Sequence, residues 1–229
     1  MRMRWMLPLA LALACAGGAE AGQAGRMILA LGSTGWLNAA DIQAATGAVV
    51  KQDLEQFKLQ DFTVVVLGNT PFGSLPAPVQ EGLVDYVGKG GTLLITGGSR
   101  SFGSGGYQAV SPIIPFQIRS ESDWRATPFR PPIALQPGHP IMAGVTFITV
   151  GAVNDMKPRG DASEILRAAG GGSAGGGSFP FPLVAEVAPG SGRVIGVALD
   201  LNEFAGMRDL PLFVRNTMVY LAGASQLGR

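Results

Sequence analysis

The spacing closest to a catalytic motif is Gly97-Gly98-Ser99-Arg100-Ser101, which follows the apolar run Thr92–Thr96. A buried strand that runs straight into a glycine-flanked turn is the arrangement that lifts a nucleophilic Ser or Cys above a sheet. The serine form needs a glycine two residues before and two residues after the nucleophile. Ser99 has Gly97 before it but Ser101 after it. No thiol lies where a thiolate would be expected, so the motif is a nucleophile site without its nucleophile.

A serine nucleophile is the alternative, with Ser99 or Ser101 activated by His139, the only histidine in the chain. A serine hydroxyl is a weak nucleophile unless a positioned base takes its proton. These hydroxyls can instead bond the backbone of their own loop, and the Gly138-His139-Pro140-Ile141 context is typical of a structural turn. One histidine and one cysteine cannot form the usual zinc site, which needs three or four ligands. The sequence predicts no metal site and no cofactor.

The loop that begins at Gly97 is the predicted binding surface, because it leaves the carboxyl end of a strand and open α/β sheets bind ligands at that edge. Its glycines allow close approach of a backbone. Arg100 adds a charge and Tyr107 adds a ring, and both could contact a partner. Asp200, which closes a later strand, could present a carboxylate at the same edge. The predicted binding residues are Gly97, Gly98, Ser99, Arg100, Ser101, Gly105, Gly106 and Tyr107.

Strand and helix patterns alternate around this loop. Phe62–Leu67 and Thr92–Thr96 are apolar enough for strands covered on both faces. Between them, Pro78–Gly88 repeats apolar residues at helical spacing, so the three segments predict a right-handed βαβ unit with parallel strands. Leu183–Val187 and Arg193–Leu199 flank a glycine-containing turn, which predicts a β-hairpin near the C-terminus.

Other segments have weaker patterns. Arg26–Leu31 predicts a first strand that feeds Gly32-Ser33-Thr34-Gly35. Those glycines could cradle a ligand, but two isolated glycines favour a simple turn. Phe116–Ile118 predicts a strand, Arg125–Pro140 a proline-punctuated loop, and a last helix begins near Asp209, a good N-cap.

Several of these segments together resemble the putative glutamine amidotransferase family, class I amidotransferase-like domains of bacterial envelope proteins. The resemblance is carried by the Asp-hydrophobic strand at Asp61–Leu67, by Tyr86–Gly91, and by the Gly-Gly-x-x-Ser-Phe-Gly-x-Gly-Gly-Tyr run at 97–107. Shorter matches lie at Ser111–Pro115, Gly138–Ile141, Gly192–Val194 through Leu199-Asp200, and Pro211–Asn216.

This resemblance implies a flavodoxin-like α/β fold, a mostly parallel sheet with helices on both faces. It also implies a glutaminase, which needs a Cys thiolate activated by a His that a carboxylate orients. The residues do not supply that chemistry. We therefore expect a non-catalytic binding or assembly module for an envelope protein partner or a small ligand, with an oligomeric state that the sequence leaves open.

The N-terminus predicts export. Met1–Trp5 is basic, Met6–Ala16 is apolar but too short to span a bilayer, and Ala19-Glu20-Ala21 favours signal-peptide cleavage before Gly22. The alternative is a lipoprotein anchored through Cys15. Residues 22–229 are expected to form one domain without a membrane span, with a mobile glycine-rich loop at 170–178. A formal charge of +1 lacks the excess of basic residues that is typical of proteins that bind nucleic acid.

Overall fold

A computed structural model describes residues 26–130, 132–146, 150–168, 181–203 and 208–227. An eight-stranded sheet forms its centre, in the order β2-β1-β3-β4-β12-β11-β10-β7. The strands are β1 (Met27–Leu31), β2 (Val49–Lys51), β3 (Val64–Leu67), β4 (Thr92–Thr96), β7 (Pro132–Ala134), β10 (Ser163–Ala168), β11 (Pro182–Val187) and β12 (Arg193–Val197). Two small antiparallel sheets pair β5 (Phe116–Ile118) with β9 (Met156–Pro158), and β6 (Trp124–Arg130) with β8 (Val150–Asn154).

The first five strands of this order are parallel. Counted along the chain, the parallel part runs 2-1-3-4-5, the order of flavodoxin-like sheets. The remaining three strands pair antiparallel, and β11 and β12 form the predicted hairpin. Because β12 lies between β4 and β11, the hairpin joins the parallel half of the sheet to the antiparallel half.

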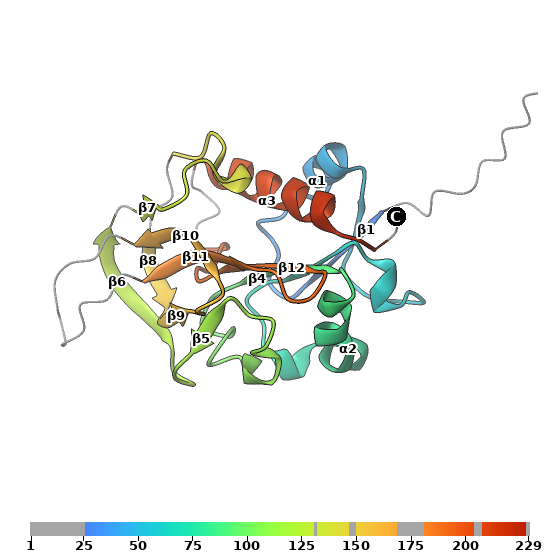
Figure 1. The fold of residues 1–229 in the computed structure, drawn as a ribbon, viewed down its shortest axis with the longest axis horizontal. Coiled ribbons are helices and arrows are strands. Elements are labelled where there is room, and N and C mark those ends of the chain that lie inside the picture. Colours follow the sequence, from blue (N-terminus) through green and yellow to red (C-terminus); the bar gives the residue numbers. More distant parts are fainter. Residues whose placement is uncertain (1–25, 131, 147–149, 169–180, 204–207, 228–229) are drawn as a thin grey trace, which may run out of the picture.

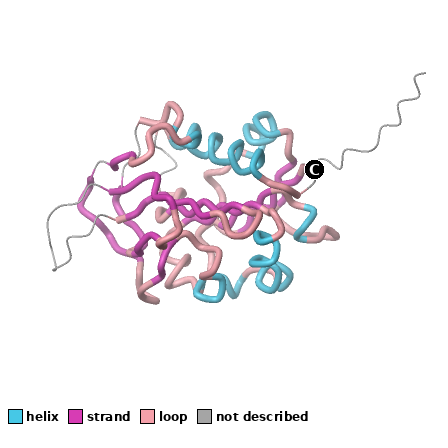
Figure 2. The backbone as a smooth tube through the Cα atoms, in the orientation of Figure 1, coloured by secondary structure: helices cyan, strands magenta, loops and turns pink. Residues whose placement is uncertain are grey.

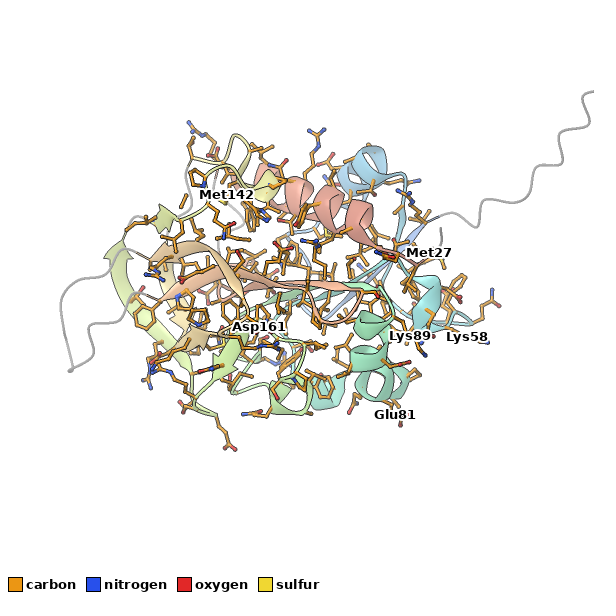
Figure 3. All side chains as sticks on the ribbon, viewed as in Figure 1. Met27, Lys58, Glu81, Lys89, Met142 and Asp161 are labelled. Carbon is orange, nitrogen blue, oxygen red and sulfur yellow. The ribbon has the colours of Figure 1, made fainter. Side chains whose placement is uncertain are left out.

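Helices cover both faces of the sheet (Figures 1 and 2). The helices are α1 (Ala39–Thr46), α2 (Ala77–Gly88) and α3 (Leu210–Ala224), and the 3-10 turns are η1 (Leu59–Asp61), η2 (Phe72–Ser74), η3 (Tyr107–Val110) and η4 (Pro140–Met142). One apolar layer holds the buried faces of α1 and α3, and the other that of α2. Figure 3 shows Met142 on the side of α3, and Glu81 pointing outward from α2.

Burial explains why the predicted βαβ unit folds as expected. Every residue of β3 and β4 is buried, as the continuous apolar runs require. On α2, the buried residues are Val79, Leu83, Tyr86 and Val87, the face that the helical spacing predicts. The phenol of Tyr86 donates to the carbonyl oxygens of Phe62 and Thr92, each at 3.2 Å, so the helix is fixed to two segments of the sheet.

Two local predictions are corrected. Residues 125–140 are not one loop: they contain most of β6, together with β7 and the start of η4. Proline does not prevent a strand at Pro132 because β7 is the last strand of the sheet, and an edge position does not need every N–H. Asp209 does precede α3, but its carboxylate accepts from the backbone N–H (2.7 Å) and hydroxyl (2.8 Å) of Thr146 rather than from the helix.

Some predictions concern residues outside the described part of the chain. These are the signal peptide at 1–21 with its alternative anchor Cys15, and the glycine-rich loop at 170–178. In the ranges that the structure covers, no helix is both long and apolar enough to cross a bilayer.

Candidate functional site

The loop after β4 lies where the sequence predicts it. β4 is central, paired with β3 on one side and β12 on the other, and both pairings are parallel. The chain segments that follow β1, β3 and β12 therefore leave the sheet at the same edge as the loop that begins at Gly97. We call this the carboxyl edge, and it is the candidate functional site.

The turn after β4 is filled by the side chain of Asn154, at the end of β8. Asn154 is fully buried. Its Oδ1 accepts from the N–H of Gly98 at 2.9 Å, and its Nδ2 donates to the carbonyl of Gly98 at 3.1 Å. A Cβ on Gly97 would lie 2.3 Å from Asn154 Oδ1 and 2.7 Å from the backbone carbon of Ala198. The nucleophile position therefore has no room for a side chain.

The same amide removes a potential oxyanion donor. In nucleophile elbows, the N–H of the residue after the nucleophile helps to hold the developing negative charge. With the nucleophile position at Gly97, that donor would be the N–H of Gly98, which Asn154 already occupies. In this turn, the position that the sequence compares with a nucleophile has no room for a side chain, and the N–H of the next residue is already bonded.

A second amide, Asn69 after β3, closes the turn from the other side. Its Oδ1 accepts from the N–H of Arg100 at 2.8 Å, and its Nδ2 donates to Asp200 Oδ2 at 2.7 Å. Gly98 has φ +133°, and a Cβ there would lie 2.2 Å from the Asn69 side chain. Asn69 thus ties the loop after β4 to the segment after β12.

Asp200 continues this network toward β1. Its Oδ1 accepts from the backbone N–H and from the side chain of Asn202, each at 2.9 Å. The Asn202 amide also donates to the carbonyl of Ser33, in the turn after β1, at 3.0 Å. Burial, and secondarily the negative charge of Asp200, raises the pKa of Glu203 above its usual value. A chain of side-chain amides and one carboxylate therefore links the turns after all four strands.

The rest of the predicted loop is held by Asp123. This carboxylate is fully buried and accepts from the N–H groups of Gly103 (3.0 Å) and Ser104 (3.3 Å). A Cβ on Gly103 would lie 1.9 Å from the carbonyl oxygen of Ser120, so the loop packs closely on the segment before β6. The loop is a fixed surface with defined contacts at both ends.

The predicted binding residues divide into an exposed and a buried group. Ser99, Arg100 and Gly106 are exposed, whereas Gly97, Gly98, Ser101, Gly105 and Tyr107 are buried. The expectation that Tyr107 offers its ring to a partner is corrected, because the ring packs against Phe72 and Phe102 and the hydroxyl donates to the carbonyl of Thr70 at 3.0 Å. Burial raises the pKa of Tyr107 above the usual tyrosine value.

The serine and histidine of the alternative catalytic set are not brought together. Ser101 is fully buried and donates to the carbonyl of Thr96 at 2.7 Å, so it supports its own loop. His139 contributes to the other side of the molecule, against α3: its Nε2 lies 3.0 Å from Glu186 Oε2, and its ring contacts Tyr220 at 5.0 Å between centroids.

Glu186 is the centre of the cluster that holds His139. Arg193 pairs with Glu186, and the Tyr220 hydroxyl donates to Glu186 Oε1 at 2.9 Å. Burial and the hydrogen bond to Glu186 raise the pKa of Tyr220 to about 12. Arg193 is the first residue of β12, at the end of the strand opposite the carboxyl edge, so the cluster stabilises the sheet away from the predicted site.

A hollow of about 560 Å³ opens at the carboxyl edge beside β1. It is lined by Gly32–Gly35, with Ala30, Leu37, Gln52 and Asn202. Here the sequence prediction of a simple turn is incomplete, because the turn forms the wall of a cavity. Gly32 has φ +81°, and a Cβ on Gly68 would lie 2.2 Å from the carbonyl oxygen of Ser33, so glycines let the turns after β1 and β3 pack together.

Sequence reasoning missed the residues that close the site. Asn69 and Asn154 follow or end strands far from Gly98 along the chain, and no local spacing pairs them with it. The available signal was the position of Asn69, a polar residue two positions after the end of the buried strand β3. Asp200 was the one member of the network whose place at this edge the sequence indicated.

No family model matches the chain, and no curated protein matches its sequence. Its fold does match solved structures. A cytoplasmic protein of Salmonella typhimurium, STM3548, has a TM-score of 0.63 at 15% identity, over 85% of this chain and 98% of that chain. A ThuA-like protein of Bacteroides uniformis has a TM-score of 0.53 at 14% identity, over 86% of this chain and 91% of that chain. A β-galactosidase of Rahnella sp. R3 has a TM-score of 0.55 at 13% identity, over 85% of this chain but only 30% of that chain.

At such low identity these likenesses show the fold alone. The matches support the α/β fold that the resemblance implied, and no match shows the family. The described residues thus form a mixed α/β domain with a large, mostly parallel sheet, helices on both faces and a carboxyl edge whose turn after β4 is filled by side chains.

Proposed function

We propose that this chain is a non-catalytic, amidotransferase-like binding module that is exported to the bacterial envelope. The observation that carries the proposal is the pairing of the Asn154 amide with both backbone groups of Gly98. A thiolate enzyme needs that turn open, with a side chain at the nucleophile position and a free N–H beside it. The chain has one cysteine, Cys15, in the predicted leader, and its one histidine is bonded to Glu186.

The binding surface in this proposal is the exposed part of the carboxyl edge. Ser99 and Arg100 project from a loop whose backbone is fixed by Asn69 and Asp123. A rigid loop loses little conformational entropy when a partner docks, and arginine is enriched in protein interfaces. Arg100 is the residue on which we expect recognition of an envelope protein to depend.

A coupled ammonia assay on residues 22–229 with glutamine tests the non-catalytic half. We expect no turnover above buffer, and none for Gly97→Cys, because the added side chain meets Asn154 and the Ala198 backbone. Turnover that disappears in Ser99→Ala, Ser101→Ala or His139→Ala would instead support an enzyme with a serine nucleophile.

Two further measurements test export and binding. Intact-mass analysis of protein from a bacterial periplasm should give a chain that begins at Gly22, and a diacylated Cys15 species would replace the signal-peptide proposal with the lipoprotein. Cross-linking in envelope extract should give partners that Arg100→Ala loses. Lys89→Ala is the matched control, since Lys89 is an exposed cation near the opposite end of β4. Equal losses from the two variants would contradict the role of Arg100.

A further inference from the structure

The hollow beside β1 lies where this sheet order places ligands. In the order 2-1-3-4-5, the connections that follow β1 and β3 lead to opposite faces of the sheet. The carboxyl ends of these two strands therefore leave a crevice between them. The hollow is walled by the turn after β1 and bounded by Gln52, which follows β2, and by Asn202, which follows β12. Its position therefore makes it a candidate ligand site, distinct from the closed turn after β4.

The side chains that line the hollow offer no positive charge to an anionic ligand. None of the eight residues that form the hollow is charged. The N-terminus of α1 is close in sequence, but Asn38 Oδ1 already accepts from the N–H groups of Ala40 (3.1 Å) and Asp41 (3.3 Å). Asp41 also places a carboxylate in the first helical turn. A phosphate would find no basic side chain in the hollow, and Asn38 already bonds two of the helix amides of the kind that bind phosphate.

The orientation of Asn202 shows what the hollow requires of a ligand. Its Nδ2 donates to two oxygens, the carbonyl of Ser33 and Asp200 Oδ1, which uses both amide hydrogens. Its Oδ1 is therefore the atom left for other contacts. This oxygen lies 3.4 Å from where a Cβ on Gly35 would be, at the wall of the hollow. An acceptor held in this way favours a ligand that can donate a hydrogen bond to it.

The other polar side chains of the hollow are Ser33, Thr34 and Gln52. Hydroxyls both donate and accept, and the Gln52 amide offers one group of each kind. A ligand with several hydroxyls matches this set, because a hydroxyl can donate as well as accept. One hydroxyl can donate to Asn202 Oδ1, and the others can pair with the hydroxyls and the amide that line the hollow. We propose that the hollow binds a small uncharged polyol. This inference rests on the proposed function, since it names the ligand of the same binding module.

Nuclear magnetic resonance of the purified, ¹⁵N-labelled protein tests the proposal. Xylitol and myo-inositol, an acyclic and a cyclic polyol, should each shift the side-chain amide signals of Gln52 and Asn202 in a saturable way, and inorganic phosphate should not. Gln52→Ala should weaken binding roughly 3- to 10-fold, the effect of losing about one hydrogen bond. Gln108→Ala, a change at an exposed glutamine of η3, should leave the affinity unchanged.

Three results would overturn the polyol site: no saturable shift with either polyol, binding of phosphate at the same amides, or equal affinity in Gln52→Ala and the unchanged protein. Gln52 is exposed, so this variant is expected to fold and its result to be informative. Failure here would leave the ammonia and cross-linking results intact. Glutaminase turnover would refute the non-catalytic proposal whatever the polyols do.

Discussion

Replacing Asn154 by alanine should destabilise the protein more than the same change at Asn216. The substitution removes one acceptor and one donor from a fully buried site. It leaves the N–H of Gly98 without its acceptor, whereas the carbonyl of Gly98 still accepts from the N–H of Ser101 at 3.3 Å. A buried polar group left unsatisfied costs about 1–3 kcal/mol, and the lost hydrogen bond to the carbonyl adds about 0.5–1.5 kcal/mol, so the total loss is about 1.5–4.5 kcal/mol. This is a large share of a total stability of about 5–15 kcal/mol.

Urea unfolding followed by circular dichroism measures this loss, and thermal unfolding should show about 2–4 °C per kcal/mol for a chain of this size. The matched control is Asn216→Ala. The Asn216 amide also donates to two carbonyls, of Ala143 at 2.9 Å and Ile141 at 3.4 Å, but it is only partly buried. Water can replace its hydrogen bonds, so we expect a loss below about 1 kcal/mol. Equal losses in the two variants would refute the argument from buried pairing.

Asn154→Asp tests separately the two hydrogen bonds that the Asn154 amide makes with Gly98. A carboxylate keeps the acceptor for the Gly98 N–H but faces the Gly98 carbonyl without a donor. Burial should raise the pKa of this carboxyl above its unfolded value of about 3.9, so its ionisation opposes folding. The variant should therefore be least stable at neutral pH and regain stability as the pH falls through the raised pKa. A pH-independent loss would contradict this reasoning.

Three further predictions concern other parts of the carboxyl edge. Gly98→Ala should destabilise the protein strongly in urea, whereas Gly73→Ala should not, because a Cβ at Gly98 meets Asn69 at 2.2 Å and one at Gly73 meets nothing within 4 Å. Ser101→Ala should lose about 1–3 kcal/mol, since it leaves the buried Thr96 carbonyl without the hydroxyl, and a smaller loss would mean that water reaches it. Glu203→Gln should be more stable than the unchanged protein at pH 7 and equally stable below about pH 4, where glutamate is protonated in the unfolded chain as well. A stability difference that persists at low pH would show that the raised pKa of Glu203 is not its source.

Four of the five parallel strands, β1, β3, β4 and β12, are predicted from the sequence because their burial requires a continuous apolar run. β2 is not predicted, since it has three residues and none of them is buried. β3, β4 and α2 each have a pattern that can be read within a dozen residues. β7 and β10 belong to the partly exposed half, and their alternation is interrupted by prolines or by shifts of register, so neither was predicted as a strand. β7 is in addition an edge strand, which needs fewer apolar residues and so gives a weaker periodic signal.

The site could be located but not completed from sequence. The position of the loop at Gly97 follows from the strand before it, which is a local property. The closure of that loop depends on Asn154, 56 residues from Gly98, and on Asn69, 31 residues from Arg100. Such pairs are set by the packing of whole elements. The burial of Tyr107 has the same origin, since it follows from contacts with Phe72 and Phe102.

The insertion of β12 between β4 and β11 has a consequence for the order of folding. Its register joins Thr92 to Arg193, whereas β1, β3 and β4 lie within one continuous stretch near the N-terminus. During synthesis, those strands can pair long before β12 and α3 leave the ribosome. Until then β4, which is buried on both faces in the finished protein, is an apolar edge open to other chains. Chains truncated before Arg193 should therefore aggregate, and a holdase that shields this edge would raise the yield of folded protein.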